Sequence, residues 1–127
     1  MANIDYKLVL SNNQSHAATS TNSSAVQITT GRAYDPLMIV VRLTTAFSSG
    51  QLDSIKVQTA TDAAFTTPID LCTFVVGSLV TQTKPATLMQ LMVPYEHKEY
   101  IRLVYVSASA PAGGVIFASL NKDVKIG

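Results

Sequence analysis

Two histidines and one cysteine are the side chains with the most direct catalytic or metal-binding potential in this chain of 127 residues. His97 lies in the charged sequence Tyr95-Glu96-His97-Lys98-Glu99, just before an apolar run, whereas His16 lies in a polar stretch. A zinc site needs three or four converging ligands, and no H-x-x-x-H or C-x-x-C pair completes such a set. We therefore interpret the surroundings of His97 as a solvated turn, and we expect no metal and no cofactor.

Nucleophilic catalysis is the second chemistry to test. No G-x-S-x-G motif is present, because Ser78 follows Gly77 directly and is followed by Leu79 and Val80. Cys72 lies between apolar neighbours, where a buried thiol behaves as a small hydrophobic group. Phosphate-binding glycine loops are also absent. The aspartates are too dispersed for a calcium-binding loop: Asp53, Asp62, Asp70 and Asp123. We predict no catalytic residue and a protein that is not an enzyme.

The composition indicates which partners to expect. Only 13% of residues are charged, and nine Lys and Arg against eight Asp and Glu leave a net charge of +1, which argues against direct contact with nucleic acid. Fourteen threonines and twelve serines take the place of charges, and such a surface suits close contact with another protein. No signal peptide and no apolar run of about 20 residues is evident, so we expect no membrane segment. The single cysteine predicts a fold without an internal disulfide.

Alternation of apolar and polar residues with period two dominates the chain. In residues 25–30 Val26 and Ile28 share one face, and in residues 52–59 Ile55 and Val57 point inward while Lys56 and Gln58 point outward. Residues 37–43 and 100–106 are apolar on both faces except for one arginine each, which is typical of central strands. Further strands are predicted at residues 73–76, 79–83, 88–93 and 115–120. Turns are predicted at residues 31–36, 48–50 and 110–114, and a loop or single helical turn at residues 61–68. Seven to nine strands without intervening helices predict an all-β, single-domain antiparallel sandwich or barrel.

The polar segment 11–24 has the composition of an extended arm or loop. We therefore divide the chain into an N-terminal strand or extended arm, residues 1–24, and a β-sandwich core, residues 25–127, within one domain overall. Such an arm can add as a strand to a neighbour's sheet edge, so Asn12, Asn13 and Gln14 are candidate contacts with a partner protein. Completing a self-association and forming a floppy lead-in to the first strand are the alternatives.

The two doubly apolar runs also bear on assembly. A two-sheet sandwich covers only one face of each sheet. If Met38, Val40, Tyr100, Val104 and Val106 lie on the outer face, another protein surface must cover them, and a neighbouring copy is the simplest cover. Loops of the same chain are the alternative. These five residues complete our set of candidate interface positions.

The order of several short motifs resembles a known family. The chain reads Ile4-Asp5, then Leu8, Ser11 and Gln14, then Ser20-Thr21-Asn22; later come Val93-Pro94, Tyr100-Ile101-Arg102-Leu103 with Tyr105, and Gly113-Gly114 with Ala118. This order is similar to the pattern "I-D-x-x-L-x-x-S-x-x-Q … S-T-N … L-P … x-Y-x-R-L-x-Y … G-G-x-x-x-A" of a family of capsid cement (head decoration) proteins of tailed bacteriophages. Val93 stands where the pattern has Leu, and residues 95–98 are more charged than the family's turn.

The resemblance implies a jelly-roll-like β-sandwich that forms a homotrimer on the outer surface of an icosahedral phage head. Its partner would be the major capsid protein, bound at three-fold positions between hexamers and pentamers, and its location the virion. The function so implied is stabilisation of the head against the pressure of packaged DNA. The alternative from another class is a non-catalytic β-sandwich binding module for a glycan or a receptor.

Overall fold

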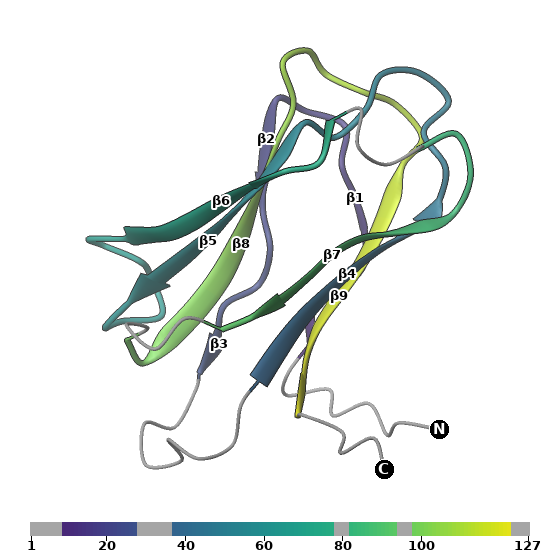
Figure 1. Cartoon of the computed structure of the whole chain (residues 1–127). Helices are drawn as coiled ribbons and strands as arrows, with labels where there is room; N and C mark the ends of the chain where they lie inside the picture. The colour runs from purple at the N-terminus through teal and green to yellow at the C-terminus, as the bar shows by residue number, and fades with distance from the viewer. Residues whose placement is uncertain (1–8, 28–36, 78–81, 94–97, 123–127) are drawn as a thin grey trace, which may run out of the picture.

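A computed structural model describes residues 9–27, 37–77, 82–93 and 98–122 of the chain, with all nine of the strands named here lying inside those ranges. No peptide bond is cis in the described part. The strands are β1 Val9–Ser15, β2 Ser20–Asn22, β3 Val26–Gln27, β4 Leu37–Thr45, β5 Ser54–Ala60, β6 Ile69–Val75, β7 Ala86–Met92, β8 Tyr100–Val106 and β9 Val115–Lys122 (Figure 1).

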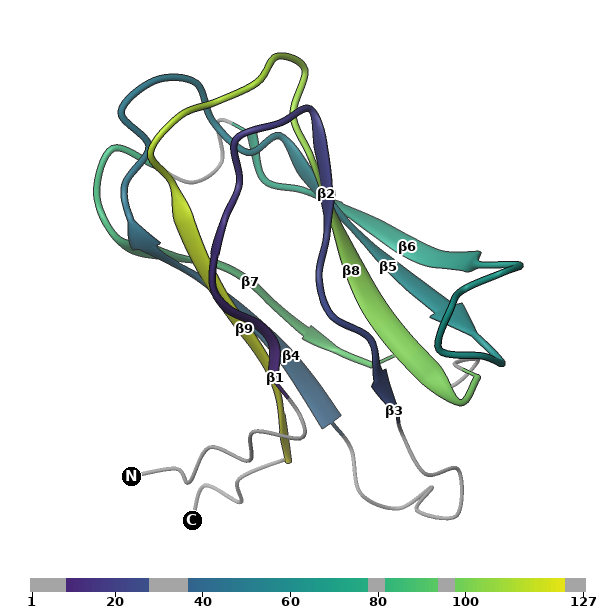
Figure 2. The same ribbon diagram turned by 180° about the vertical axis from the view of Figure 1, so that it is seen from behind.

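The strands form two antiparallel sheets, which Figures 1 and 2 show as two facing layers. Sheet A has the order β1-β9-β4-β7, and sheet B has the order β2-β8-β5-β6, with β3 also pairing with β8. The first strand thus pairs with the last, β2 and β3 pair with β8, β4 pairs with β7, and β5 pairs with β6. This nested pairing is that of a long hairpin rolled up into a jelly roll. The predicted all-β, jelly-roll-like sandwich is confirmed.

Period-two alternation decides which side chains fill the space between the sheets. Ile39 and Val41 of β4 and Ile101 and Leu103 of β8 are completely buried, while the residues between them point outward. Strand β4 lies between β9 and β7, and β8 lies between β2/β3 and β5. The prediction that these two arginine-bearing runs form central strands is therefore confirmed. Ile55 and Val57 are also buried as predicted, and so is Val26 of β3.

Some predicted boundaries differ from the structure. Strand β6 begins at Ile69, four residues before the predicted start. Gln82 and Thr83, predicted to lie in a strand, lie in a turn instead, and residues 78–81 are outside the described residues, as is the predicted turn at 31–36. Residues 61–68 form a loop without a helix. The predicted turn before β9 is present, and a Cβ atom on Gly114 would lie 2.1 Å from the Phe47 ring, so this position requires glycine.

Of the two alternatives for the N-terminal segment, a strand or an extended arm, residues 9–24 follow the first. Strand β1 pairs with β9 in sheet A, and β2 pairs with β8 in sheet B, so this segment belongs to the sandwich rather than preceding it. The polar composition of this segment favoured an exposed arm, but several of its polar side chains have hydrogen-bond partners inside the fold. Residues 1–8 lie outside the described residues. The domain division at residue 24 therefore does not correspond to a boundary in the described structure.

Candidate protein-interaction site

The predicted interface residues of the two central strands lie on opposite sides of the molecule. Met38 and Val40 point outward from sheet A and are half-buried. Tyr100, Val104 and Val106 point outward from sheet B, where Val104 is only 8% exposed. All five thus lie on the outer faces of their sheets, but on two different sheets, because period two places a residue on a face of its strand and does not say to which sheet the strand belongs.

The three candidates in β1 separate in a similar way. Asn12 and Asn13 are exposed on an edge strand, and Asn13 has a φ of 54° at an irregularity of the β1–β9 register. The Gln14 side chain is used inside the chain, since its Nε2 donates to the Asn22 carbonyl at 2.8 Å and its Oε1 accepts from Ser11 Oγ at 2.7 Å. Asn12 and Asn13 are therefore accessible to a partner, whereas Gln14 links β1 to β2.

The outer face of sheet A carries several apolar side chains among polar ones such as Gln90 and Ser119, the two cross-strand partners of Val40. Val115 and Phe117 of β9 and Met92 of β7 join Met38 and Val40 there, and Met92 is 43% exposed. Among the described side chains that point outward from this sheet, the charged one is Arg42. We call these six residues the sheet A face. Sequence reasoning missed Val115, Phe117 and Met92, although the alternation within residues 115–120 already separates Val115 and Phe117 from the buried Ile116 and Ala118.

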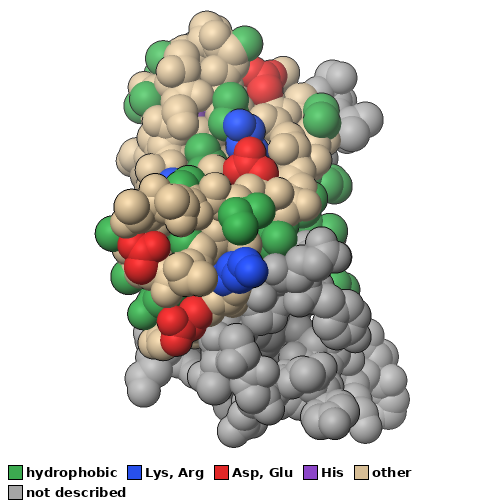
Figure 3. Space-filling view, turned by 90° about the vertical axis from the view of Figure 1, so that its left-hand side faces the viewer, with side chains coloured by type: hydrophobic (Ala, Val, Ile, Leu, Met, Phe, Trp, Pro, Cys, Tyr) green, Lys and Arg blue, Asp and Glu red, His purple; other side chains and the backbone are tan. Residues whose placement is uncertain are grey.

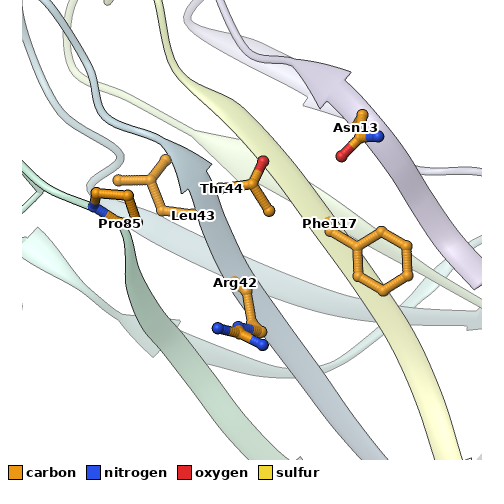
Figure 4. A pocket seen from close by; sticks show the side chains of 6 residues that line it. All are labelled: Asn13, Arg42, Leu43, Thr44, Pro85 and Phe117. Carbon is orange, nitrogen blue, oxygen red and sulfur yellow. The ribbon is translucent and has the colours of Figure 1, made fainter.

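A depression of about 430 Å³ lies on this side of the molecule (Figure 4). Its lining comes from β1, β4, the start of β7 and β9: Asn13, Arg42, Leu43, Thr44, Pro85 and Phe117. The Arg42 side chain is exposed and has no hydrogen bond or ion pair with the residues that the structure describes. An unpaired guanidinium between apolar walls can bind a carboxylate, but it supplies neither a nucleophile nor a general base.

The outer face of sheet B is more polar and is partly covered by its own chain. Arg102 Nε donates to Gln58 Oε1 at 2.9 Å, and the guanidinium lies 4.4 Å from the centroid of the Phe65 ring. Phe65 comes from the loop between β5 and β6 and is only 5% exposed. Figure 3, which looks at this side, shows hydrophobic side chains in several separate patches among polar and charged ones. Covering by loops of the same chain therefore applies in part to this side.

His16 lies in the interior of the sandwich, although its neighbours in the sequence are polar. It is fully buried, and the rings of Phe47 and Tyr105 lie 6.3 and 6.1 Å from its own. Ser107 Oγ donates to the Gln51 carbonyl at 2.8 Å, so His16 Nε2, 2.9 Å away, must carry the proton and donate to that oxygen. His16 Nδ1 then accepts from Thr21 Oγ1 at 2.7 Å. A histidine that donates to a serine does not activate it as a nucleophile, so His16 is a structural link.

The remaining reactive groups do not form a catalytic or metal centre in the described residues. Burial raises the pKa of Cys72, which keeps the thiol protonated near neutral pH. Hydrogen bonds from the Ala108 N–H and from Gln51 lower the pKa of Asp53. In ranges 9–27, 37–77, 82–93 and 98–122, no three His, Cys, Asp or Glu residues lie together as metal ligands would. Ser78, Glu96, His97 and Asp123 fall outside these ranges. No helix within them is both long and apolar enough to cross a bilayer.

No protein-family model matches the sequence, and no curated protein matches it either. The motifs behind the resemblance to phage cement proteins have structural roles in this chain. The Ser11 hydroxyl donates its one hydrogen to Gln14 Oε1. It therefore accepts from the hydroxyl of the buried Tyr105, 2.7 Å away. Gly114 leaves room for Phe47, and Ala118 is fully buried. These motifs therefore describe how a jelly roll of this kind is held together.

Proposed function

We propose that the protein is a capsid cement protein, a structural virion component that binds as a trimer to the outer surface of an icosahedral phage head. Its partner is the major capsid protein. The observation that carries the proposal is the sheet A face, because a cluster of outward apolar side chains beside an exposed arginine on a small protein favours contact with another protein. The motif resemblance adds the kind of assembly, and the low net charge agrees with a protein partner rather than a nucleic acid.

Stabilisation of the head follows from mass action. A protein that binds the assembled lattice and not the separate subunits shifts the equilibrium toward the intact shell as its sites fill. A trimer presents three copies of each contact, so weak individual contacts add up through effective concentration. No catalytic step is needed, which agrees with the structural use of His16 and with the raised pKa of Cys72.

The direct test incubates the purified protein with undecorated heads and measures co-sedimentation, the temperature at which heads release DNA, and density at the three-fold positions. We expect saturable binding and a higher release temperature. Val40→Asp, which places a charge on the sheet A face, should abolish trimer formation or head binding, whereas Ser20→Asp on the exposed strand β2 is the matched control for a new carboxylate. Absence of binding by the wild-type protein to any undecorated tailed-phage head would contradict the proposal.

One observation favours the alternative of a glycan or receptor module. The depression places the Phe117 ring beside the Asn13 amide and the Arg42 guanidinium, a combination of stacking surface and hydrogen-bond donors (Figure 4). A glycan array followed by thermal shift separates the two functions. A ligand-dependent rise in melting temperature that Phe117→Ala removes, together with no binding to heads, would replace the cement proposal with this one.

A further inference from the structure

Strongly exposed hydrophobic side chains occur at two separate places in the described part of the chain. Met92, 43% exposed, belongs to the sheet A face, whereas Ile69 and Val75, 49% and 61% exposed, belong to β6. Strand β6 is an edge strand of sheet B and pairs only with β5 in the described residues, so one side of its backbone is open for a further strand or surface. One protomer thus exposes hydrophobic side chains at two different surfaces, one on each sheet.

The two surfaces also carry opposite charges. Arg42 is the unpaired cation of the sheet A face, and Asp70 is an exposed carboxylate on the outer face of β6, the face that also carries Val75, because the two pair with Gln58 and Ser54 of β5. Gln58 Nε2 donates to Asp70 Oδ1 at 2.7 Å, which leaves further lone pairs of the carboxylate for a guanidinium. Four acidic residues lie in the described part, and of these only Asp70 lies within a strand; the others are Asp53, Asp62 and Glu99.

We infer that copies of this chain associate head to tail, with β6 of one copy docked on the sheet A face of the next and Asp70 paired with Arg42. Charge complementarity between the two surfaces selects a second copy as the occupant. A two-fold dimer needs one patch that matches itself, whereas two different patches give a heterologous contact, which forms a ring when the rotation between successive copies closes. The number of copies in the ring, three, rests on the proposed function. The contact between β6 and the sheet A face does not.

The test compares oligomer mass and dissociation by light scattering and native mass spectrometry across a concentration series. Arg42→Glu and Asp70→Arg each place like charges across the contact, and each should weaken association at least about tenfold. The double variant R42E/D70R restores opposite charges in every contact of the ring and should regain most of the lost association. Glu99→Arg reverses an exposed carboxylate that also accepts from a glutamine amide, Gln27 Nε2 at 3.2 Å, and that lies outside both surfaces, so it is the matched control for Asp70→Arg.

A second control guards against loss of folding. Asp70→Asn keeps an oxygen that accepts from Gln58 and removes only the charge, so it should fold normally and weaken association less than Asp70→Arg. Circular dichroism and urea unfolding confirm that each variant is folded. A wild-type monomer at high concentration, single variants that associate like wild type, or a double variant no better than either single one would each overturn the inference.

The outcomes separate this inference from the proposed function. Heads that bind the wild-type protein, combined with oligomers insensitive to Arg42→Glu and Asp70→Arg, would overturn the docking contact and leave the cement function standing. Charge-sensitive rings that bind no heads would support the contact and contradict the cement function.

Discussion

Buried polar side chains show how single residues hold β1 and β2 in the sandwich. His16, Ser11 and Tyr105 lie between the sheets, and each has a hydrogen-bond partner. The described structure contains no buried side-chain nitrogen or oxygen without a partner. Burying a polar group without a hydrogen-bond partner raises the free energy of the folded state, whereas burying a paired one changes it little. A polar segment can therefore belong to a core if distant strands provide its partners. Here they come from positions 91 and 94 residues further along the chain.

The buried position of His16 predicts a pH dependence of stability. Burial lowers the pKa of His16 below its ordinary value of 6.5, so between the lowered value and 6.5 the unfolded chain binds a proton that the folded chain does not. The free energy of unfolding should therefore fall as the pH decreases through this interval and level off below it. Urea unfolding at a series of pH values measures this dependence.

His16→Asn is the control for this prediction. The variant keeps a side-chain hydrogen-bonding group and removes the titration, so its free energy of unfolding should change less between pH 7 and the acidic end of the interval. His97 is present in both proteins, and its contribution cancels in the comparison. Equal pH dependence of the two proteins would show that His16 is not excluded from protonation in the folded state.

At the scale of elements, one glutamine connects the crossover between the sheets to the start of β5. Gln82 is 5% exposed, and its amide pairs with the backbone of Leu52 as another strand would: the Leu52 N–H donates to Gln82 Oε1 at 2.8 Å, and Gln82 Nε2 donates to the Leu52 carbonyl at 2.9 Å. The Phe47 N–H donates to the Gln82 carbonyl at 3.2 Å. The Gln82 side chain thus makes the two hydrogen bonds to Leu52 that the backbone of a neighbouring strand would otherwise make.

Gln82→Ala should therefore be strongly destabilising. The substitution leaves the N–H and carbonyl of Leu52, a completely buried residue, without partners, and we expect a loss of about 2–4 kcal/mol. Chemical denaturation followed by circular dichroism measures it. Gln58→Ala also removes two side-chain hydrogen bonds, but on the half-exposed outer face of sheet B where water replaces them, and should cost about 1 kcal/mol or less. Similar losses for both variants would contradict the role assigned to Gln82.

At the scale of the whole molecule, the two sheets differ in what their outer sides offer. Sheet B is partly covered by the Phe65 loop, and its Arg102 is engaged by Phe65 and Gln58. The sheet A face combines apolar side chains with the unpaired Arg42. Association through the sheet A face removes this surface from water, so the stability of the fold becomes linked to protein concentration.

This linkage predicts a concentration-dependent melting temperature. If folded copies form the proposed ring, each tenfold rise in concentration should raise the melting temperature by about 2–5 °C. Scanning calorimetry over a hundredfold concentration range measures the change. For Arg42→Glu the same rise should require concentrations at least about tenfold higher, and Glu99→Arg should behave like the wild-type protein. A constant melting temperature for the wild type would contradict self-association.

Much of the fold could be predicted because period two is local. Alternation within residues 52–59 identified the buried side of β5, and the two arginine-bearing runs proved to be central. The same rule failed for β1 and β2, whose polar residues gain partners only after folding. It also could not say which candidate interface residues share a side of the molecule, because sheet membership depends on strand pairing between distant segments.

The amino-acid sequence by itself determined an all-β chain with little charge and the inward and outward sides of strands such as β5. Only the tertiary structure decided that Met38 and Tyr100 face opposite ways out of the molecule, that His16 is interior, and that Arg42 and Asp70 lie on different surfaces. The physical reason is that alternation is set by the geometry of a single strand, whereas burial, hydrogen-bond partners and surface patches are created when strands far apart in the chain pair and the two sheets pack.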